Sequence, residues 1–332
     1  MKNEDSLKLK DVGERGFLKK IASIVDETEL GFNEDASAFS LPSKDLLVMN
    51  IDMLVNKTDV LPGMSYEQMG KKAVTMSVSD VIAKGAQPQG CLVSLGVPGD
   101  TQVKDAYELL EGVKKQCNFY DILFLGGDLN ETDDMIVDVF SFGVCKSDQV
   151  ISRKGVQDGD IIYSTGLFGL TSLAFQILLE NQSVSGDLRE QSLNSVYEPK
   201  ARIDVLELFK QLPIKVCMDS SDGLLVTLYE LSQINKMGIE IDNVPIHQKV
   251  LEFSLERESN PLDYAFKGGE EFELIFAVGP EIEDSLKEKA EKLRIRINQI
   301  GSFKKSIDGI KIRDSRLLEY ELPDMGFEHF RK

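Results

Sequence analysis

Acidic side chains recur in this sequence where apolar segments stop. The apolar run 46–51 ends at Asp52, the run 122–125 leads through two glycines to Asp128, and the run 216–218 ends at Asp219. Because an unpaired buried carboxylate is costly, it normally requires a cation, hydrogen-bond donors or a metal. One interpretation is therefore a metal or phosphate site. For residues 219–222 alone, side-chain caps for a helix that starts near residue 223 are an equally good interpretation.

Two more acidic positions lie outside these runs. Glu34 and Asp35 occupy a loop at 31–37, and Asp80 interrupts the apolar stripe of a helix predicted over 65–84. Asp80 has an alternative explanation, because a residue at the edge of the stripe can reach solvent. A lone Gly-Gly-Asp, as at 126–128, is also more often a turn than a ligand site. Only the five acidic groups taken together favour one shared site.

The residue types favour magnesium and phosphoryl transfer. Carboxylates without supporting imidazoles or thiolates suit a hard cation that also binds water and phosphate oxygens. The chain has only two histidines, His247 and His329, so neither a histidine-rich zinc site nor a Ser-His-Asp triad is expected. Phosphoryl transfer needs mainly positioning and charge neutralisation, which an acidic magnesium cleft supplies. Arg153 and Lys154 are candidates to hold a phosphate, although a basic pair in a loop is usually solvated.

The composition limits the class of protein. With 332 residues, of which 42% are apolar, the chain can form a full core and is expected to have two domains. The net charge of -18 argues against nucleic acid or an anionic membrane as a partner. No apolar run reaches the roughly 20 residues of a membrane-spanning helix, and residues 1–10 are too polar for a signal sequence, so a cytoplasmic protein is expected. The dispersed cysteines are typical of a reduced protein.

Alternating strand and helix patterns must position the acidic side chains. Helices are predicted over 13–25, 65–84, 103–117, 170–179, 201–211, 224–234, 248–258 and 281–293, and strands over 46–52, 92–98, 122–125, 135–144, 161–165, 216–218, 238–241, 272–276, 295–300 and 309–312. The strand at 46–52 is expected to be buried on both faces. Residues 166–169 favour a tight turn, and the polar segment 181–195 favours an irregular, mobile region. A polar stretch at 147–155 predicts a boundary between domains 1–146 and 147–332.

Seven blocks of sequence carry a resemblance to a known family. They are Asp-Met-Leu-Val at 52–55, Ser-Val-Ser-Asp at 77–80 with Ala-Lys-Gly-Ala-Gln-Pro at 83–88, Gly-Gly-Asp at 126–128, the segment from Arg153 to Asp160, Asp-Ser-Ser-Asp-Gly-Leu at 219–224, Gly-Gly-Glu-Glu-Phe-Glu-Leu at 268–274 and Gly-Phe-Glu-His-Phe at 326–330. In this order, over nearly the whole chain, they resemble the thiamine-monophosphate kinases. Thr-Asp-Val at 58–60 resembles the archaeal branch of that family. Each block alone is only moderately specific, but seven in register are strongly specific.

The resemblance implies a fold and an activity. The fold is α/β with two domains, like aminoimidazole ribonucleotide synthetase: the N-terminal domain has a mixed sheet that joins its counterpart across a homodimer interface and binds metal and ATP, and the C-terminal domain is α/β. The implied reaction is magnesium-dependent, direct transfer of the ATP γ-phosphate to thiamine monophosphate, which gives thiamine diphosphate without a covalent enzyme intermediate.

The resemblance also implies roles for individual residues. Catalytic roles are implied for Asp128, Asp219 and Arg153, of which Arg153 would contact phosphate. Contacts to ATP are implied for Gly127, Ser221 and Asp222. Arg153, Glu270 and Phe327 are implied for the thiamine monophosphate side. The implied magnesium ligands are Glu34, Asp35, Asp52, Asp80, Asp128, Asp219 and Asp222.

The chain departs from the family pattern near its N-terminus. Where the family usually has Gly-Asp-Asp, this sequence has Asn33, Glu34 and Asp35, and Asn50 and Ile51 replace the threonines expected before Asp52. Two alternatives to an active kinase therefore stay open. One is a dimeric nucleotide-binding homologue with little or no catalytic activity, and the other is a different ATP-dependent member of the same superfamily.

Overall fold

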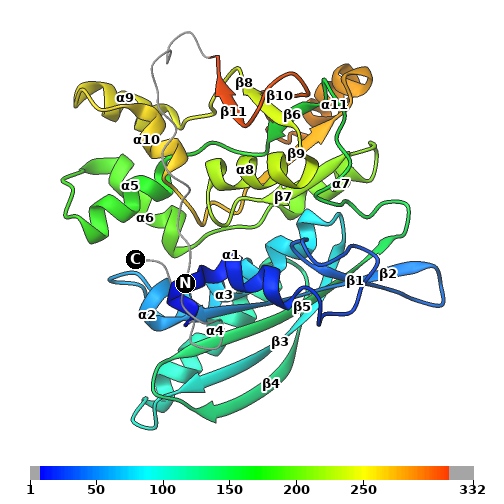
Figure 1. The fold of residues 1–332 in the computed structure, drawn as a ribbon. Helices are drawn as coiled ribbons and strands as arrows, with labels where there is room; N and C mark the ends of the chain where they lie inside the picture. Colours follow the sequence, from blue (N-terminus) through cyan, green and yellow to red (C-terminus); the bar gives the residue numbers. More distant parts are fainter. Residues whose placement is uncertain (1–7, 314–332) are drawn as a thin grey trace.

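The computed structural model describes residues 8–313 and contains two β-sheets, one from each half of the chain (Figure 1). The first sheet has five strands in the order β1-β2-β5-β3-β4. These are β1 (Ser37–Ser40), β2 (Asp45–Val55), β3 (Gln87–Val97), β4 (Leu123–Glu131) and β5 (Ile136–Lys146). Only the β3–β4 pair is parallel among the neighbouring strands, so the sheet is mixed.

Helices α3 (Tyr66–Ala83) and α4 (Val103–Phe119) cover one face of this sheet. They approach each other closely because glycines lie at their contact. A Cβ on Gly70 would stand 2.1 Å from the carbonyl oxygen of Leu109, and Gly112 is equally close to the α3 backbone. Close packing fixes α3 firmly between the first sheet and the second half of the chain. The remaining helices of this half are α1 (Leu9–Ile21) and α2 (Asn56–Asp59).

The second half forms a six-stranded sheet in the order β11-β8-β10-β6-β9-β7. Its strands are β6 (Ile161–Ser164), β7 (Val216–Asp219), β8 (Gly238–Ile241), β9 (Leu274–Val278), β10 (Asn298–Lys304) and β11 (Ile310–Ile312). Its α-helices are α5 (Leu170–Leu179), α6 (Gly186–Tyr197), α7 (Leu206–Phe209), α8 (Leu224–Asn235), α9 (Gln248–Glu256), α10 (Pro261–Phe266) and α11 (Glu283–Leu293), and the 3-10 helices are η2 (Ile203–Val205) and η3 (Pro280–Ile282). The predicted fold class, an α/β fold of two parts with a mixed N-terminal sheet, is confirmed, and the second sheet is mixed as well.

Several local predictions are wrong. The predicted irregular segment 181–195 contains most of α6, because Leu188 and Leu193 pack against the apolar side of α5. The single helix predicted over 201–211 is instead η2 followed by the short helix α7. Gly-Gly-Asp at 126–128 does not end a strand, since β4 continues through it to Glu131. The domain limits 1–146 and 147–332 stay a prediction.

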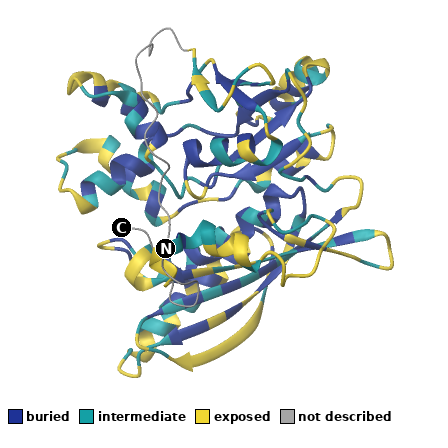
Figure 2. Cartoon of the chain, viewed as in Figure 1, coloured by how far each residue is buried: buried dark blue, intermediate teal, exposed yellow. Residues whose placement is uncertain are grey.

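The face of the first sheet that points away from α3 and α4 is apolar and exposed. Ile51 is paired with Phe140, and Phe140 is paired on its other side with Leu92, so these three side chains form a row across β2, β5 and β3. Ile51 is 64% exposed, and Leu123 at the start of the edge strand β4 is 62% exposed. Figure 2 shows the exposure of β4 over nearly its whole length. We call this surface the outer sheet face: Ile51, Met53, Leu92, Leu123, Leu125, Phe140 and Phe142.

The alternation in β2 contradicts the prediction that this strand is buried on both faces. Leu46, Val48 and Leu54 are buried, whereas Ile51 and Met53 are 64% and 49% exposed. Apolar residues of β2 therefore lie on both sides of a sheet that α3 and α4 cover on one side only. Among the described residues, no helix combines the length and the apolar character that crossing a membrane requires.

A buried polar network connects the two halves of the chain. Tyr120, at the end of α4, is 1% exposed, and its hydroxyl oxygen accepts a hydrogen bond from the backbone N–H of Ala201 at 2.8 Å. The same hydroxyl is 3.0 Å from Thr75 Oγ1 in α3, and Gln116 donates to Thr75 Oγ1 at 2.9 Å. Because these groups are excluded from water, each depends on the others for its hydrogen bonds.

Replacing Tyr120 by phenylalanine is expected to destabilise the protein by about 1–3 kcal/mol, since it leaves the buried N–H of Ala201 without an acceptor. Urea unfolding followed by circular dichroism measures the change. Tyr107→Phe is the matched control, because Tyr107 on the same helix is 64% exposed and should tolerate the loss of its hydroxyl. Equal stability of the two variants would contradict this account of the network.

Candidate active site

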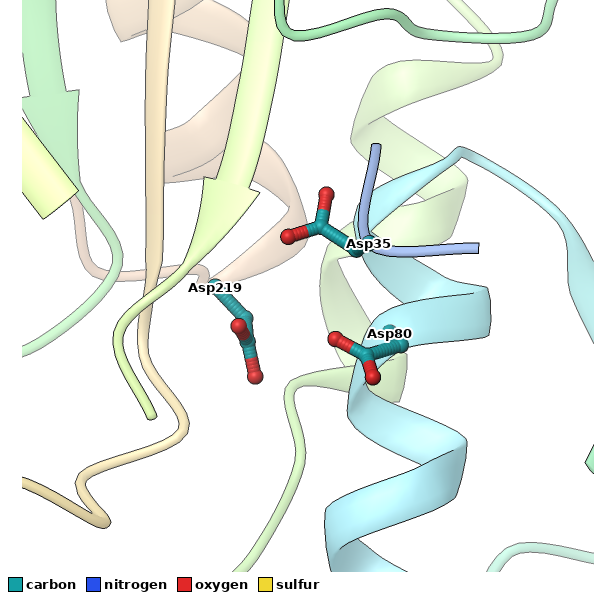
Figure 3. A group of neighbouring side chains, drawn as sticks. All are labelled: Asp35, Asp80 and Asp219. Atoms are coloured by element: carbon teal, nitrogen blue, oxygen red, sulfur yellow. The ribbon is translucent and has the colours of Figure 1, made fainter. Parts of the chain in front are cut away.

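Three carboxylates from distant parts of the sequence converge between the two halves of the chain. Asp35, Asp80 and Asp219 each have a carboxylate oxygen within 4.8 Å of the others. Figure 3 shows their origins: Asp35 comes from the loop before β1, Asp80 from helix α3 and Asp219 from the end of β7. We call these three residues the carboxylate trio.

Each member of the trio is held in place by its own polar contacts. The Asp35 side chain has no exposed area and forms ion pairs with Lys84 and Arg153. Asp80 accepts a hydrogen bond from the Asn50 amide at 2.7 Å. Asp219 accepts one from the Ser79 hydroxyl at 2.8 Å.

The trio carries more negative charge than its surroundings neutralise. Burial, and then repulsion by Asp219 and Asp35, raises the pKa of Asp80 well above its ordinary value. Burial, followed by repulsion from Asp35, raises the pKa of Asp219 to about 7. Burial also opposes ionisation of Asp35, but Arg153 and Lys84 together hold the pKa of Asp35 below its usual range. Neither Asp80 nor Asp219 forms an ion pair in the part of the chain that the structure describes, and the nearby Arg153 guanidinium lowers both pKa values without offsetting burial and repulsion.

The loop that carries Asp219 interlocks with a second loop. Ser220 N–H donates to the carbonyl oxygen of Glu273 at 2.8 Å, and Glu270 N–H donates to that of Ser221 at 2.6 Å. Gly223 has a φ of +93°, and a Cβ there would stand 2.2 Å from the Gly268 carbonyl oxygen, so only glycine fits. The N-cap of α8 is Gly223, and no side chain caps this helix. The capping interpretation of residues 219–222 is therefore wrong.

Asp52 and Asp222 lie beside the trio. The pKa of Asp52 is raised to about 6 by burial and by repulsion from neighbours that include Asp59 and Asp222. Asp52 also contributes to the raised pKa values of Asp80 and Asp219. These two carboxylates extend the acidic region on the side of the sheet that faces α3.

Asp128 is not brought to the trio. It lies within β4, and its strand register places it opposite Ser94, which is paired with Asp138 on the other side. This row continues to Met53, so by register Asp128 belongs to the outer sheet face. Gly127 lies against β3, where a Cβ would stand 1.6 Å from the Val93 carbonyl oxygen, so no other residue fits. The predicted roles of Asp128 and Gly127 stay predictions.

Glu34 and Arg153 form a connection between the two halves. Both oxygens of Glu34 accept the backbone N–H of Arg153, each at 2.9 Å. Lys84 Nζ also donates to Glu34 Oε2 at 2.6 Å, and Ser152 Oγ donates to Oε1 at 2.5 Å. The Arg153 guanidinium group lies between Asp35 and Glu230. Glu34, a predicted metal ligand, is thus fully engaged in binding the segment around residue 152.

Asn50, the second departure from the family pattern, supports the trio. Its amide nitrogen donates both to Asp80 Oδ2 at 2.7 Å and to the backbone carbonyl of Asp35 at 3.0 Å, while its carbonyl oxygen accepts from Ser77 at 2.9 Å. Asn50 therefore connects two members of the trio. A threonine, with a single hydroxyl, could not make all three contacts. Ile51 is on the outer sheet face, away from the trio.

Of the remaining predicted binding residues, Glu270 and Ser221 lie in the described part of the chain. Glu270 lies at the interlocked loops, 2.5 Å from the ammonium group of Lys72. Phe327 lies outside the described residues. Ser221 donates a weak hydrogen bond of 3.3 Å to Asp219 Oδ1.

Sequence reasoning missed the residues that hold the trio, namely Asn50, Ser79 and Lys84, and also Lys72. Lys84 follows Asp80 by four residues and so shares its side of the helix, a signal that could have identified it. Lys72 and Lys84 have no exposed side-chain area, which their sequence neighbours do not reveal. No local pattern marks Asn50 or Ser79, because their partners come from other strands and helices.

Comparisons with known proteins show the family to which the chain belongs. Residues 33–145 match the family model for the N-terminal domain of AIR synthase related proteins, and residues 157–310 match that for the C-terminal domain. The chain is 32% identical to a thiamine-monophosphate kinase of Nitrosopumilus maritimus, over 90% of this chain and 93% of the relative. It is 33% identical to one of Pyrococcus abyssi, over 89% of both. The solved structure of AaThiL complexed with AMPPCP and TMP is similar with a TM-score of 0.84, at 25% identity, over 98% of this chain and 99% of that chain.

Glu271 is a half-buried acid beside the interlocked loops. Its Oε1 accepts from the Thr171 hydroxyl at 2.6 Å in the first turn of α5, and its Oε2 is buried with no hydrogen-bond partner among residues 8–313. Burial raises the pKa of Glu271 to about 8. A carboxylate at this position is thus protonated in the folded protein at pH values where the unfolded chain has lost the proton.

The folded pKa of Glu271 lies above its ordinary value of 4.5, so its contribution to stability is lost as the pH rises from about 4.5 to about 8. Glu271→Gln removes this loss, and the variant is expected to be more stable than the wild type at pH 8 by about 2–4 kcal/mol. Urea unfolding at pH 5 and pH 8 tests this. Glu256→Gln, the same change at an exposed position, should leave the pH profile unchanged. A variant with the wild-type pH profile would contradict the burial of this acid.

Proposed function

Since the chain belongs to the AIR synthase related protein family and is a relative of its thiamine-monophosphate kinases, we propose that it transfers the γ-phosphate of ATP to thiamine monophosphate, giving thiamine diphosphate. The family model covers both domains, and the relatives are matched over most of their length. The structurally similar AaThiL was solved with AMPPCP, an ATP analogue, and TMP. The observation in this chain that carries the proposal is the carboxylate trio.

The donor set of the trio fits magnesium. It offers hard carboxylate oxygens within 4.8 Å of one another, and two of its three members, Asp80 and Asp219, have raised pKa values and form no ion pair among the described residues. Asp35, Asp80 and Asp219 would hold the ion or ions, with Asp52 and Asp222 beside them. When bound, magnesium supplies charge neutralisation for the phosphate oxygens of ATP.

The residues around the trio do the work of positioning. Ser79 and Asn50 fix the orientations of Asp219 and Asp80, and Lys84 with Arg153 fixes Asp35. Arg153 is proposed to contact phosphate through the N–H groups of its guanidinium group that Asp35 and Glu230 do not occupy. Glu270 and Phe327 are proposed for the thiamine monophosphate side, and Gly127, Ser221 and Asp222 for ATP. The metal and catalytic role of Asp128 stays a prediction, because its strand register places it apart from the trio. Direct transfer agrees with a site built from carboxylates and hydrogen-bond donors rather than around an activated nucleophile.

The decisive experiment is release of ADP, measured with a coupled assay, in the presence of thiamine monophosphate and magnesium. Turnover is expected with the wild type and should disappear when EDTA removes divalent cations. Asp219→Asn is expected to lower kcat by at least about a hundredfold, because it removes a charge from the trio. Asp45→Asn is the matched control, since Asp45 pairs with Lys146 on the surface, far along β2 from the trio. ATP binding by calorimetry without turnover on thiamine monophosphate would instead favour a non-catalytic nucleotide-binding protein.

We further propose that the protein acts as a homodimer in the cytoplasm, with the outer sheet faces of two copies in contact. The described cysteines are free and buried, as in a reducing compartment. The outer sheet face supports a second copy as its occupant, because it presents apolar side chains on neighbouring strands next to an unpaired edge strand, β4. A copy of the same chain can bury both the apolar row and this edge.

Light scattering after size exclusion is expected to give a mass twice the 37.1 kDa of one chain. Leu123→Glu should shift the protein to the monomer mass, because it places a charge within the proposed contact, on the edge strand β4. Leu179→Glu is the control: Leu179 is 60% exposed at the end of α5, outside this face, and its replacement should leave the dimer intact. A wild-type mass of one chain would contradict the dimer.

A further inference from the structure

Lys72 is an unusual residue in helix α3, because its side chain has no exposed area. A lysine is rarely buried without a partner, since the charged ammonium group loses its hydration. Here Nζ donates to Glu270 Oε1 at 2.5 Å and to the backbone carbonyl oxygen of Asp59 at 2.7 Å. Lys72 thus joins three separate segments: α3, the end of α2 and the loop that carries Glu270.

Glu270 combines a strained backbone with a carboxylate that burial disfavours and Lys72 stabilises. Its φ is +61°, a left-handed conformation that is unfavourable for a residue with a Cβ. Its N–H donates to Ser221 O, which joins this loop to the loop of Asp219. Its second carboxylate oxygen, Oε2, is buried without a hydrogen-bond partner in the described chain. The carboxylate is therefore held by Lys72 through one oxygen, and the other oxygen is a buried acceptor with no donor among the described residues.

We propose that Lys72 is a positioning residue for thiamine monophosphate, acting through Glu270 and Asp59 and not by contact with the substrate. Its ammonium group fixes the Glu270 carboxylate relative to the end of α2, so that the free oxygen of Glu270 meets the substrate in one orientation. This inference rests on the proposed function, which assigns Glu270 to the substrate side. It adds Lys72, a residue with no contact to the trio, to the groups that determine substrate affinity.

The neighbouring Lys71 also connects the two halves of the chain, but it makes no contact with Glu270. Lys71 also joins α3 to the second half of the chain, 3.2 Å from Glu198, and it pairs with Glu67 at 2.8 Å. Unlike Lys72, it is partly exposed, and neither partner lies at the interlocked loops. Lys71→Met is therefore a control that removes a lysine and an ion pair between the halves without disturbing Glu270.

Kinetics with each substrate varied separately test the role of Lys72. Lys72→Met is expected to raise KM for thiamine monophosphate by about tenfold or more, with KM for ATP changed less than about twofold, because a charge-assisted hydrogen bond to Glu270 is lost. Lys71→Met should change neither constant beyond about twofold. In a Glu270→Gln background, Lys72→Met should add less than about twofold, because it acts through the same carboxylate.

Binding of AMPPCP by calorimetry shows whether each variant retains its fold. Loss of thiamine monophosphate binding with AMPPCP binding retained supports the proposal. Loss of binding of both ligands would mean that Lys72 only maintains the fold, which overturns the proposal. Unchanged binding of both ligands would overturn it too. So would a double variant whose increase in KM for thiamine monophosphate equals the product of the increases in the two single variants. Wild-type protein that neither binds nor phosphorylates thiamine monophosphate would refute the proposed function itself. A wild type that does both, beside an unchanged Lys72→Met variant, would refute only this inference.

Discussion

The central constraint on this structure is that three carboxylates lie close together, largely shielded from water, between the two halves of the chain. Asp35, Asp80 and Asp219 come within 4.8 Å of one another although burial and repulsion raise the pKa of two of them. Such an arrangement persists only if the surrounding fold contributes more free energy than the cluster costs. The contributions are visible in the structure: the close α3–α4 packing at Gly70, the network around Tyr120 and the interlocked loops at Gly223 all hold the elements that carry the trio.

Both halves of the chain contribute residues to the candidate site. Helix α3 supplies Asp80 and Ser79, and the C-cap Lys84 fixes Asp35, yet Asp219 comes from the last residue of β7. The chemistry therefore belongs to neither sheet alone. The departures from the family pattern fit this view, because Glu34 binds the segment after β5 and Asn50 bridges Asp35 and Asp80. Both substitutions strengthen connections around the trio instead of simply removing ligands.

Local patterns in the sequence were enough to predict most elements and the acidic residues of the site, because apolar periodicity and the abrupt change to aspartate are properties of short segments. These local patterns failed where the structure of a segment depends on contacts with residues distant in the sequence. The helix α6 is defined by packing on α5, and the exposure of Ile51 follows from which face α3 covers. The position of Asp128 depends on strand register and an irregularity in the β3–β4 pairing, which no neighbour in sequence reveals. The supporting roles of Lys72, Ser79 and Asn50 were not predicted for the same reason.

Helix α3 has a further consequence as a spacer. Lys72 and Asp80 lie eight residues apart on one uninterrupted helix, so about 12 Å of axial rise separates them. This separation is set by the backbone hydrogen bonds of the helix, so side-chain changes at Lys72 or Asp80 that preserve the helix leave it unchanged. Helix α3 thus holds the trio and the Lys72–Glu270 pair at a fixed distance from each other.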